Sequence, residues 1–94
     1  MLEFDWDDEN EKHIAVHGVT IAEAEYVLQN PTLDYGYQDW HNEDRFAEAG
    51  STNSGRILMV ITTWRGLKTR VVTAFDAPGE VAGEYHRWKV KFDG

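Results

Sequence analysis

The sequence lacks cysteine altogether and has no long run of apolar residues. Without cysteine, disulfide bonds, thiolate catalysis and cysteine-ligated zinc sites are all excluded. A membrane-spanning helix needs about 20 consecutive apolar residues, and no stretch approaches that length. The first five residues, Met1 to Asp5, include two acidic residues and no basic one, unlike the start of a secretory signal peptide. We therefore expect a cytoplasmic protein with no membrane segment.

Basic residues are also scarce, with 9 Lys and Arg against 17 Asp and Glu and a net charge of −8 at pH 7. This balance argues against a general nucleic-acid binder, because phosphate contacts need cations. The cations are unevenly placed, however. Residues 1–42 contain only Lys12, whereas residues 43–94 contain the other eight. The second half can therefore carry a local basic patch, although a well-solvated surface is the simpler interpretation.

What the sequence does contain is enough apolar material for one core, with 41% hydrophobic and 13% aromatic residues. Ninety-four residues leave no room for a second core, so we expect a single domain over residues 1–94.

The N-terminal third predicts a short strand and two helices. Leu2 to Trp6 alternates apolar and acidic residues, which favours a strand. Asp7 or Asp8 can cap a helix that ends before Gly18. Thr20 to Glu23 has the pattern of a capping box and predicts a second helix to about Gln29.

The rest of the chain predicts a run of antiparallel strands and a final helix. The expected strands are Leu33–Tyr37, Arg45–Gly50, Arg56–Trp64 and Lys68–Phe75, with a polar turn at His41–Asp44. A last helix should run from about Gly79 to Val90. The predicted class is α+β, with an antiparallel sheet of three to four strands, two short N-terminal helices and a C-terminal helix.

A series of short motifs resembles the BrnT-type ribonuclease toxins, which look like distant relatives of the RelE-type fold. The motifs occur in the family's order: Asp5-Trp6-Asp7-Asp8-Glu9-Asn10, His13-Ile14, His17-Gly18-Val19-Thr20, Glu23, Arg45-Phe46, Ala49-Gly50, Gly55-Arg56, Arg65-Gly66 and Arg70-Val71-Val72-Thr73-Ala74. The resemblance covers nearly the whole chain and rests on order and spacing rather than on one motif. It implies a bacterial type II toxin that cleaves RNA without a metal or other cofactor. It also implies neutralisation by an antitoxin, usually a DNA-binding protein.

The sequence departs from the family at the end of its last predicted strand. Members usually continue with Ala-Arg and a helix rich in Arg and Lys, but here Phe75 stands in place of the arginine. The alternative hypothesis is therefore a catalytically silent relative that serves as a protein-binding module.

Metal-independent cleavage needs a base for the 2′-hydroxyl proton and cations for the phosphate charge. His17 is the predicted base, because imidazole titrates near pH 6.5 and because it matches the family's His-Gly-Val position. Arg45 and Arg70 lie on predicted strands, and if they share a face their guanidinium groups can clamp one phosphate. Further RNA contacts are assigned to Lys12, Arg56 and Lys68.

Each of these residues also has a structural interpretation. His17 can cap a helix C-terminus, and strand arginines often pair with carboxylates such as Glu43 and Glu48. Tyr85 and His86 are weaker candidates for a general acid.

A metal site is the less favoured interpretation of His13 and His17. Four-residue spacing puts two imidazoles on one side of a helix, but zinc needs a third and usually a fourth ligand. His41 and His86 are available, yet no spacing connects them to the pair. We expect no bound metal.

Trp40 and Trp88 lie among polar residues and are the predicted contacts for a protein partner. Aromatic residues in so small a domain are more often core or interface than platforms for base stacking.

Overall fold

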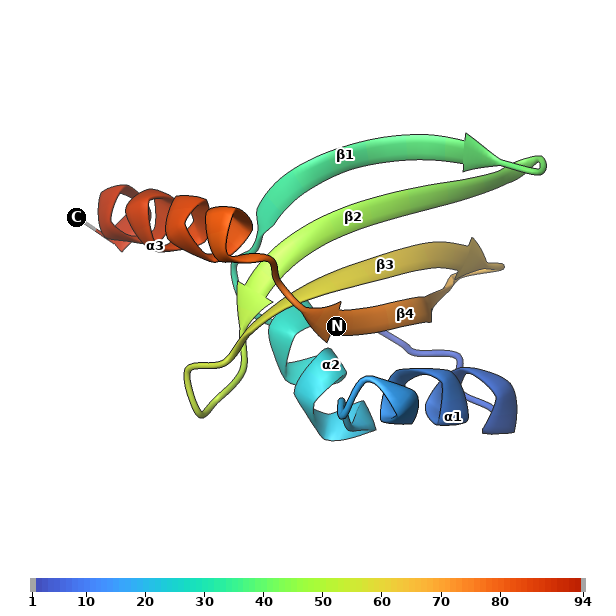
Figure 1. The fold of residues 1–94 in the computed structure, drawn as a ribbon. Helices are drawn as coiled ribbons and strands as arrows, with labels where there is room; N and C mark the ends of the chain where they lie inside the picture. The colour runs from blue at the N-terminus through green and yellow to red at the C-terminus, as the bar shows by residue number, and fades with distance from the viewer. Residues whose placement is uncertain (1, 94) are drawn as a thin grey trace.

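The computed structural model describes residues 2–93. Its elements are α1 (Asp8–Val16), α2 (Ile21–Leu28), β1 (Leu33–Trp40), β2 (Glu43–Ser51), β3 (Ile57–Arg65), β4 (Lys68–Asp76) and α3 (Gly79–Asp93). The four strands form one antiparallel sheet in the order β1-β2-β3-β4 (Figure 1). The predicted α+β fold is confirmed, with four strands.

The two N-terminal helices begin where their capping residues predict. The Asp7 side chain accepts from the Asn10 N–H, and the Asn10 side chain accepts in return from the Asp7 N–H. Thr20 and Glu23 form the same reciprocal pair at the start of α2. These capping boxes satisfy N–H groups that have no partner within the helix.

The predicted strand at Leu2–Trp6 is wrong. The segment makes one isolated parallel bridge, between Phe4 and Thr69 of the edge strand β4. Thr69 N donates to Glu3 O at 2.8 Å, and Asp5 N donates to Thr69 O at 2.9 Å. The chain must then enter the Asp7 cap of α1, which leaves no length for further pairing.

The turn between β1 and β2 is shorter than the sequence predicts. Only His41 (φ 50°) and Asn42 (φ 64°) lie between the strands, both in the left-handed region. Such a two-residue turn matches the twist of a hairpin. As a result β1 continues to Trp40 and β2 begins at Glu43.

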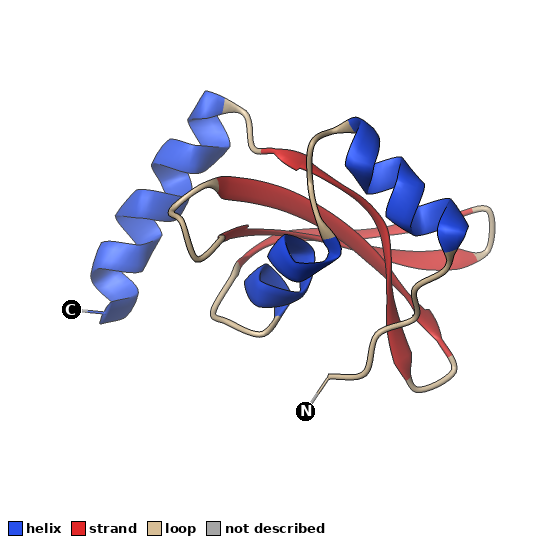
Figure 2. Ribbon diagram, turned by 90° about the horizontal axis from the view of Figure 1, so that it is seen from below, coloured by secondary structure: helices blue, strands red, loops and turns tan. Residues whose placement is uncertain are grey.

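The core lies between the sheet and the first two helices. Its buried residues are Ile14, Val19, Ala24, Val27, Leu58, Val60, Val71 and Ala74. Gly50 allows α2 to approach β2 closely, since a Cβ there would lie 2.7 Å from Val27 Cγ1. Figure 2 shows α1 and α2 on the same face of the sheet and α3 at its end. We call the face of the sheet that α1 and α2 cover the helix-covered face, and the other the opposite face.

Candidate functional site

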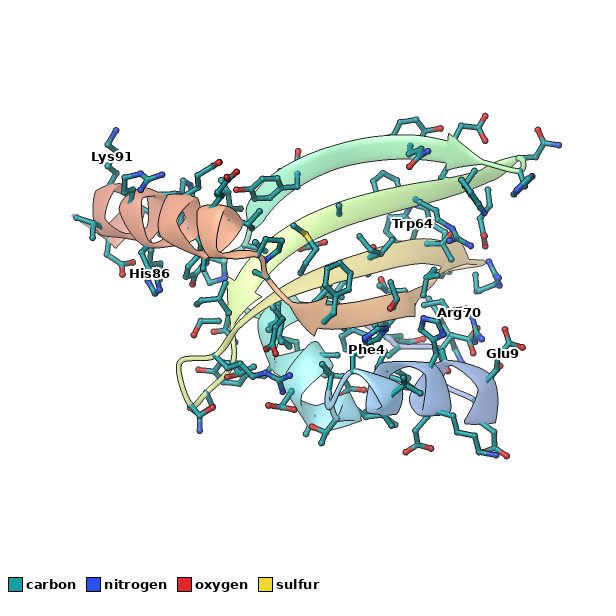
Figure 3. The ribbon with its side chains drawn as sticks, in the orientation of Figure 1. Phe4, Glu9, Trp64, Arg70, His86 and Lys91 are labelled. Carbon is teal, nitrogen blue, oxygen red and sulfur yellow. The ribbon has the colours of Figure 1, made fainter. Side chains whose placement is uncertain are left out.

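Three arginines and one histidine line a small open cleft beside α1. The cleft has a volume of about 220 Å³ and is lined by Glu9, Asn10, His13, Glu43, Arg45, Arg65, Arg70 and Val72. We call it the arginine cleft. Figure 3 shows Arg70 on β4 and Glu9 on α1 at the same end of the molecule.

The sheet register explains why Arg45 and Arg70 meet. Thr63 of β3 lies opposite Arg70 of β4, and Thr62 lies opposite Phe46 of β2. Arg45 and Thr63 are the next residues on their strands, so both point to the opposite face. Arg45 and Arg70 thus flank Thr63 in a single row across three strands.

Arg70 is held in place by the start of α1. Its side chain is only 10% exposed, and its Nη1 lies 3.0 Å from Asp7 Oδ2 and 3.6 Å from Asp5 Oδ2. The hydrogen bond from Arg70, followed by that from the Asn10 N–H, lowers the pKa of Asp7 below its usual value. Because Asp7 is itself fixed as the helix cap, the guanidinium group has little freedom to move.

Arg45 and Arg65 share a single carboxylate. Arg45 Nη2 lies 3.0 Å from Glu43 Oε2, and Arg65 Nη1 pairs with the other oxygen. The hydrogen bonds from Arg65 and then from Arg45 lower the pKa of Glu43. The Arg45 guanidinium also lies over the Trp40 ring, 5.9 Å from its centroid. Glu43 thus holds both guanidinium groups at one side of the cleft, and Glu9 adds a second carboxylate to the lining.

His17 does not line this cleft. It is the C-cap residue directly after α1, with its ring 5.8 Å from that of His13 and 6.0 Å from that of Phe75. The imidazole that the structure places beside Arg45 and Arg70 is His13, for which the sequence suggests only the role of a metal ligand.

Arg56, predicted to contact RNA, is engaged elsewhere. Its Nε lies 2.6 Å from Asp76 Oδ1, and its Nη1 donates to Gly18 O at 2.8 Å. These bonds join the end of α1 to the end of β4. Lys12 and Lys68 are exposed, and neither lines the cleft.

The remaining predicted residues lie apart from one another. His86 is on α3, at the far end of the molecule from Arg70 (Figure 3), and the neighbouring Tyr85 is buried. Trp88 packs against Tyr85 and Phe92 within α3. Trp40, the other tryptophan predicted to contact a partner, lies at the end of β1.

Acid should weaken the ion pairs of the cleft. Asp7 and Glu43 have folded-state pKa values below their usual 3.8 and 4.5, so their contribution is complete above those values and lost as the pH falls below them. We expect the melting temperature to drop between about pH 5 and pH 3. Asp7→Asn keeps the helix cap but removes the carboxylate charge, so the melting temperature of this variant should fall less between these pH values. Asp8→Asn is the matched control. An equally steep drop in Asp7→Asn would contradict the assignment.

Neither a metal cluster nor a membrane helix is found in residues 2–93. No three side chains of His, Asp or Glu gather there as metal ligands do. None of the described helices is long and apolar enough to cross a membrane.

Comparison with known proteins confirms the resemblance seen in the sequence. The family model described as "Ribonuclease toxin, BrnT, of type II toxin-antitoxin system" matches residues 6–79. The match includes α1, α2 and the whole sheet, and it ends at the first residue of α3. Curated proteins give no match.

Proposed function

Since the chain belongs to the BrnT family of ribonuclease toxins of type II toxin–antitoxin systems, we propose that the arginine cleft is its RNA-cleaving site. The observation that carries the proposal is the convergence of three guanidinium groups and an imidazole, from α1 and three strands, on one open cleft. Three of the nine Lys and Arg residues of the chain line this cleft, and cations are what a phosphate contact needs.

The cleft residues supply the two requirements of metal-independent cleavage. His13 accepts the proton of the ribose 2′-hydroxyl, and the 2′-oxygen attacks the adjacent phosphorus. Arg45 and Arg70 bind the phosphate oxygens and stabilise the charge that develops on them. The bond to the 5′-oxygen breaks, and that oxygen takes a proton from the water that enters the open cleft. The hydroxide that remains takes the proton from His13 and restores the base. His17 remains the alternative base.

The carboxylates of the cleft compete with the phosphate for the same guanidinium groups. A phosphate must replace Glu43 at Arg45, where both side chains are partly exposed, so this replacement costs little net free energy. Arg70 is buried and stays paired with Asp7, so it binds the phosphate through the N–H groups that Asp7 leaves free. The competition also predicts modest RNA affinity and a strong dependence on salt.

Membership of a type II toxin family implies a cognate antitoxin. We propose in addition that this antitoxin binds DNA and that the pair acts in the cytoplasm. Lys12 and Lys68 are proposed as outlying RNA contacts because both side chains are exposed.

The purified protein should cleave a single-stranded RNA equally well in magnesium and in excess EDTA, leaving 2′,3′-cyclic phosphate ends. The physical reason is that His13 and the arginines supply the base and the positive charge that a metal would otherwise provide. Gel electrophoresis of end-labelled RNA measures both the rate and the end groups.

Two results would contradict this proposal. Cleavage that requires magnesium would assign the chemistry to a metal. Absence of cleavage, together with RNA binding that does not depend on salt, would favour the silent protein-binding module instead.

A further inference from the structure

A row of aromatic rings crosses the helix-covered face where neither α1 nor α2 covers it. Tyr37 of β1, Phe46 of β2 and Trp64 of β3 follow one another, with ring centroids 5.5 Å and 6.2 Å apart. Tyr37 is 58% exposed and Trp64 is 53% exposed. Figure 3 shows Trp64 at the end of the sheet that extends away from α3. Exposed aromatic rows of this kind are typical of surfaces that bind a partner.

The row borders a groove between the sheet and the N-terminal segment. The groove has a volume of about 440 Å³, and its apolar lining includes Leu2, Leu28, Phe46 and Trp64. Asp34 and Glu48 also line it. An apolar floor beside carboxylates suits a ligand that is both apolar and cationic.

Two pairs of carboxylates lie directly opposite each other on the same face. Asp34 of β1 is opposite Glu48 of β2, and Asp39 is opposite Asp44, with Tyr37 and Phe46 between the two pairs. Like charges directly opposite on neighbouring strands destabilise a sheet. Within residues 2–93, none of the four forms an ion pair with a Lys, Arg or His side chain.

Three of these carboxylates accept a hydrogen bond from an uncharged donor, which leaves their negative charge in place. Thr32 Oγ1 donates to Glu48 at 2.6 Å, and the Gly36 N–H donates to Asp34 at 2.8 Å. The Tyr37 hydroxyl donates to Asp44 at 2.7 Å, which raises the pKa of the tyrosine. The repulsion across the hairpin therefore persists in the free protein.

We propose that this aromatic–acidic groove is the docking site for a cationic, amphipathic segment of the cognate antitoxin, an inference that rests on the toxin function. Apolar side chains of the segment pack against Phe46 and Trp64, and its Lys and Arg side chains lie between the paired carboxylates. Opposite charge guides the encounter, and the buried aromatic rings supply most of the affinity.

The negative charge of the groove favours the antitoxin over other ligands. RNA is repelled by four carboxylates, and a second copy of this chain brings another −8. Arg45 and Phe46 are neighbours on β2, so their side chains point to different faces of the sheet, and no residue lines both the groove and the arginine cleft. Changes in the groove should therefore alter antitoxin binding without altering RNA cleavage.

The test measures antitoxin affinity by titration calorimetry for four proteins. They are the wild type, Trp64→Ala, the double variant Asp34→Asn/Glu48→Gln and the control Glu11→Gln/Glu80→Gln. The antitoxin used is the product of the short reading frame beside the gene for this chain, so its choice does not depend on RNA cleavage. The control changes the net charge by the same amount as the double variant, at exposed positions on α1 and α3.

Trp64→Ala should weaken binding by about tenfold or more, as loss of an aromatic anchor does. Asp34→Asn/Glu48→Gln should weaken binding about tenfold at low salt and make it less dependent on salt. The same double variant should melt at a higher temperature than the wild type, since the amides keep both hydrogen bonds and remove the repulsion. A purely structural role for these residues does not predict higher stability together with weaker binding.

Unchanged antitoxin affinity in both groove variants would overturn the proposal, and so would an equal loss in the control. Weaker RNA binding by Trp64→Ala, with normal antitoxin affinity, would assign the groove to RNA and overturn it as well. RNA cleavage is measured in parallel. A wild type that binds antitoxin through the groove but cleaves no RNA supports the docking site and contradicts only the catalytic proposal.

Discussion

Replacing His13 with alanine should reduce the rate of RNA cleavage by about 10²–10⁴-fold, which is the usual contribution of a positioned general base. His13 is exposed on α1 and lines the cleft that contains Arg45 and Arg70. The core contact of this helix is the fully buried Ile14, so the substitution should leave the melting temperature nearly unchanged. Single-turnover cleavage of a labelled RNA, with thermal melting beside it, measures both effects.

His17→Ala is the matched comparison, since it removes the same side chain one helical turn away. His17 lies beside Phe75 and does not line the cleft, so its loss should have a much smaller effect on cleavage. A larger loss of cleavage in His17→Ala than in His13→Ala would assign the role of base to His17, as the sequence suggests. Full activity in both variants would contradict an imidazole base altogether.

Local sequence patterns predict most of the fold because the forces that form its elements are local. Two capping boxes mark the starts of α1 and α2, and the apolar stretch Ile57–Ile61 marks a central strand. The prediction of a strand at Leu2–Trp6 is wrong because strand pairing depends on a partner distant in the sequence. The alternation of the segment suits a strand, but Thr69 on the edge of β4 offers it only two backbone hydrogen bonds before Asp7 begins α1.

The site is harder to predict because its residues meet through long-range pairing. The sequence identifies Arg45 and Arg70, but only the register across Thr63 shows that they share a row. The position of α1 along β4 depends on Asn10, a buried side chain whose Nδ2 donates to Val71 O at 3.1 Å. His13 is one turn from this anchor and His17 is two turns from it, which places His13 nearer to the cleft.

The departure from the family at Phe75 has a limited consequence in the structure. Phe75 is half-buried, and its ring lies 6.0 Å from that of His17. It does not line the arginine cleft, where Arg45, Arg65 and Arg70 are all present. Loss of the family's arginine at this position therefore leaves the proposed phosphate-binding groups intact.

Arg45→Ala should lower kcat by about 10²–10³-fold, the usual loss when one donor to a transition-state oxyanion is removed. It should also make RNA binding less dependent on salt, by about 0.7 in the slope of log K against log salt for each lost contact with a single strand. The fold should survive, because the carboxylate of Glu43 keeps Arg65 as a partner. Cleavage rates and RNA titrations at several salt concentrations measure the two effects.

Arg70 requires a different substitution, because Arg70→Ala would leave Asp5 and Asp7 without their cation and so weaken the start of α1. Arg70→Lys keeps the positive charge but loses the bidentate geometry of the guanidinium group. The relative loss in cleavage rate should therefore be larger than the relative loss in protein stability. Arg87→Ala is the control, since it removes the same charge from an exposed position on α3. If Arg87→Ala reduces cleavage as much as Arg45→Ala does, the effect comes from net charge, and the arginine cleft is not the catalytic site. If only the cleft variants lose activity, the guanidinium groups of the arginine cleft are needed to bind and cleave RNA.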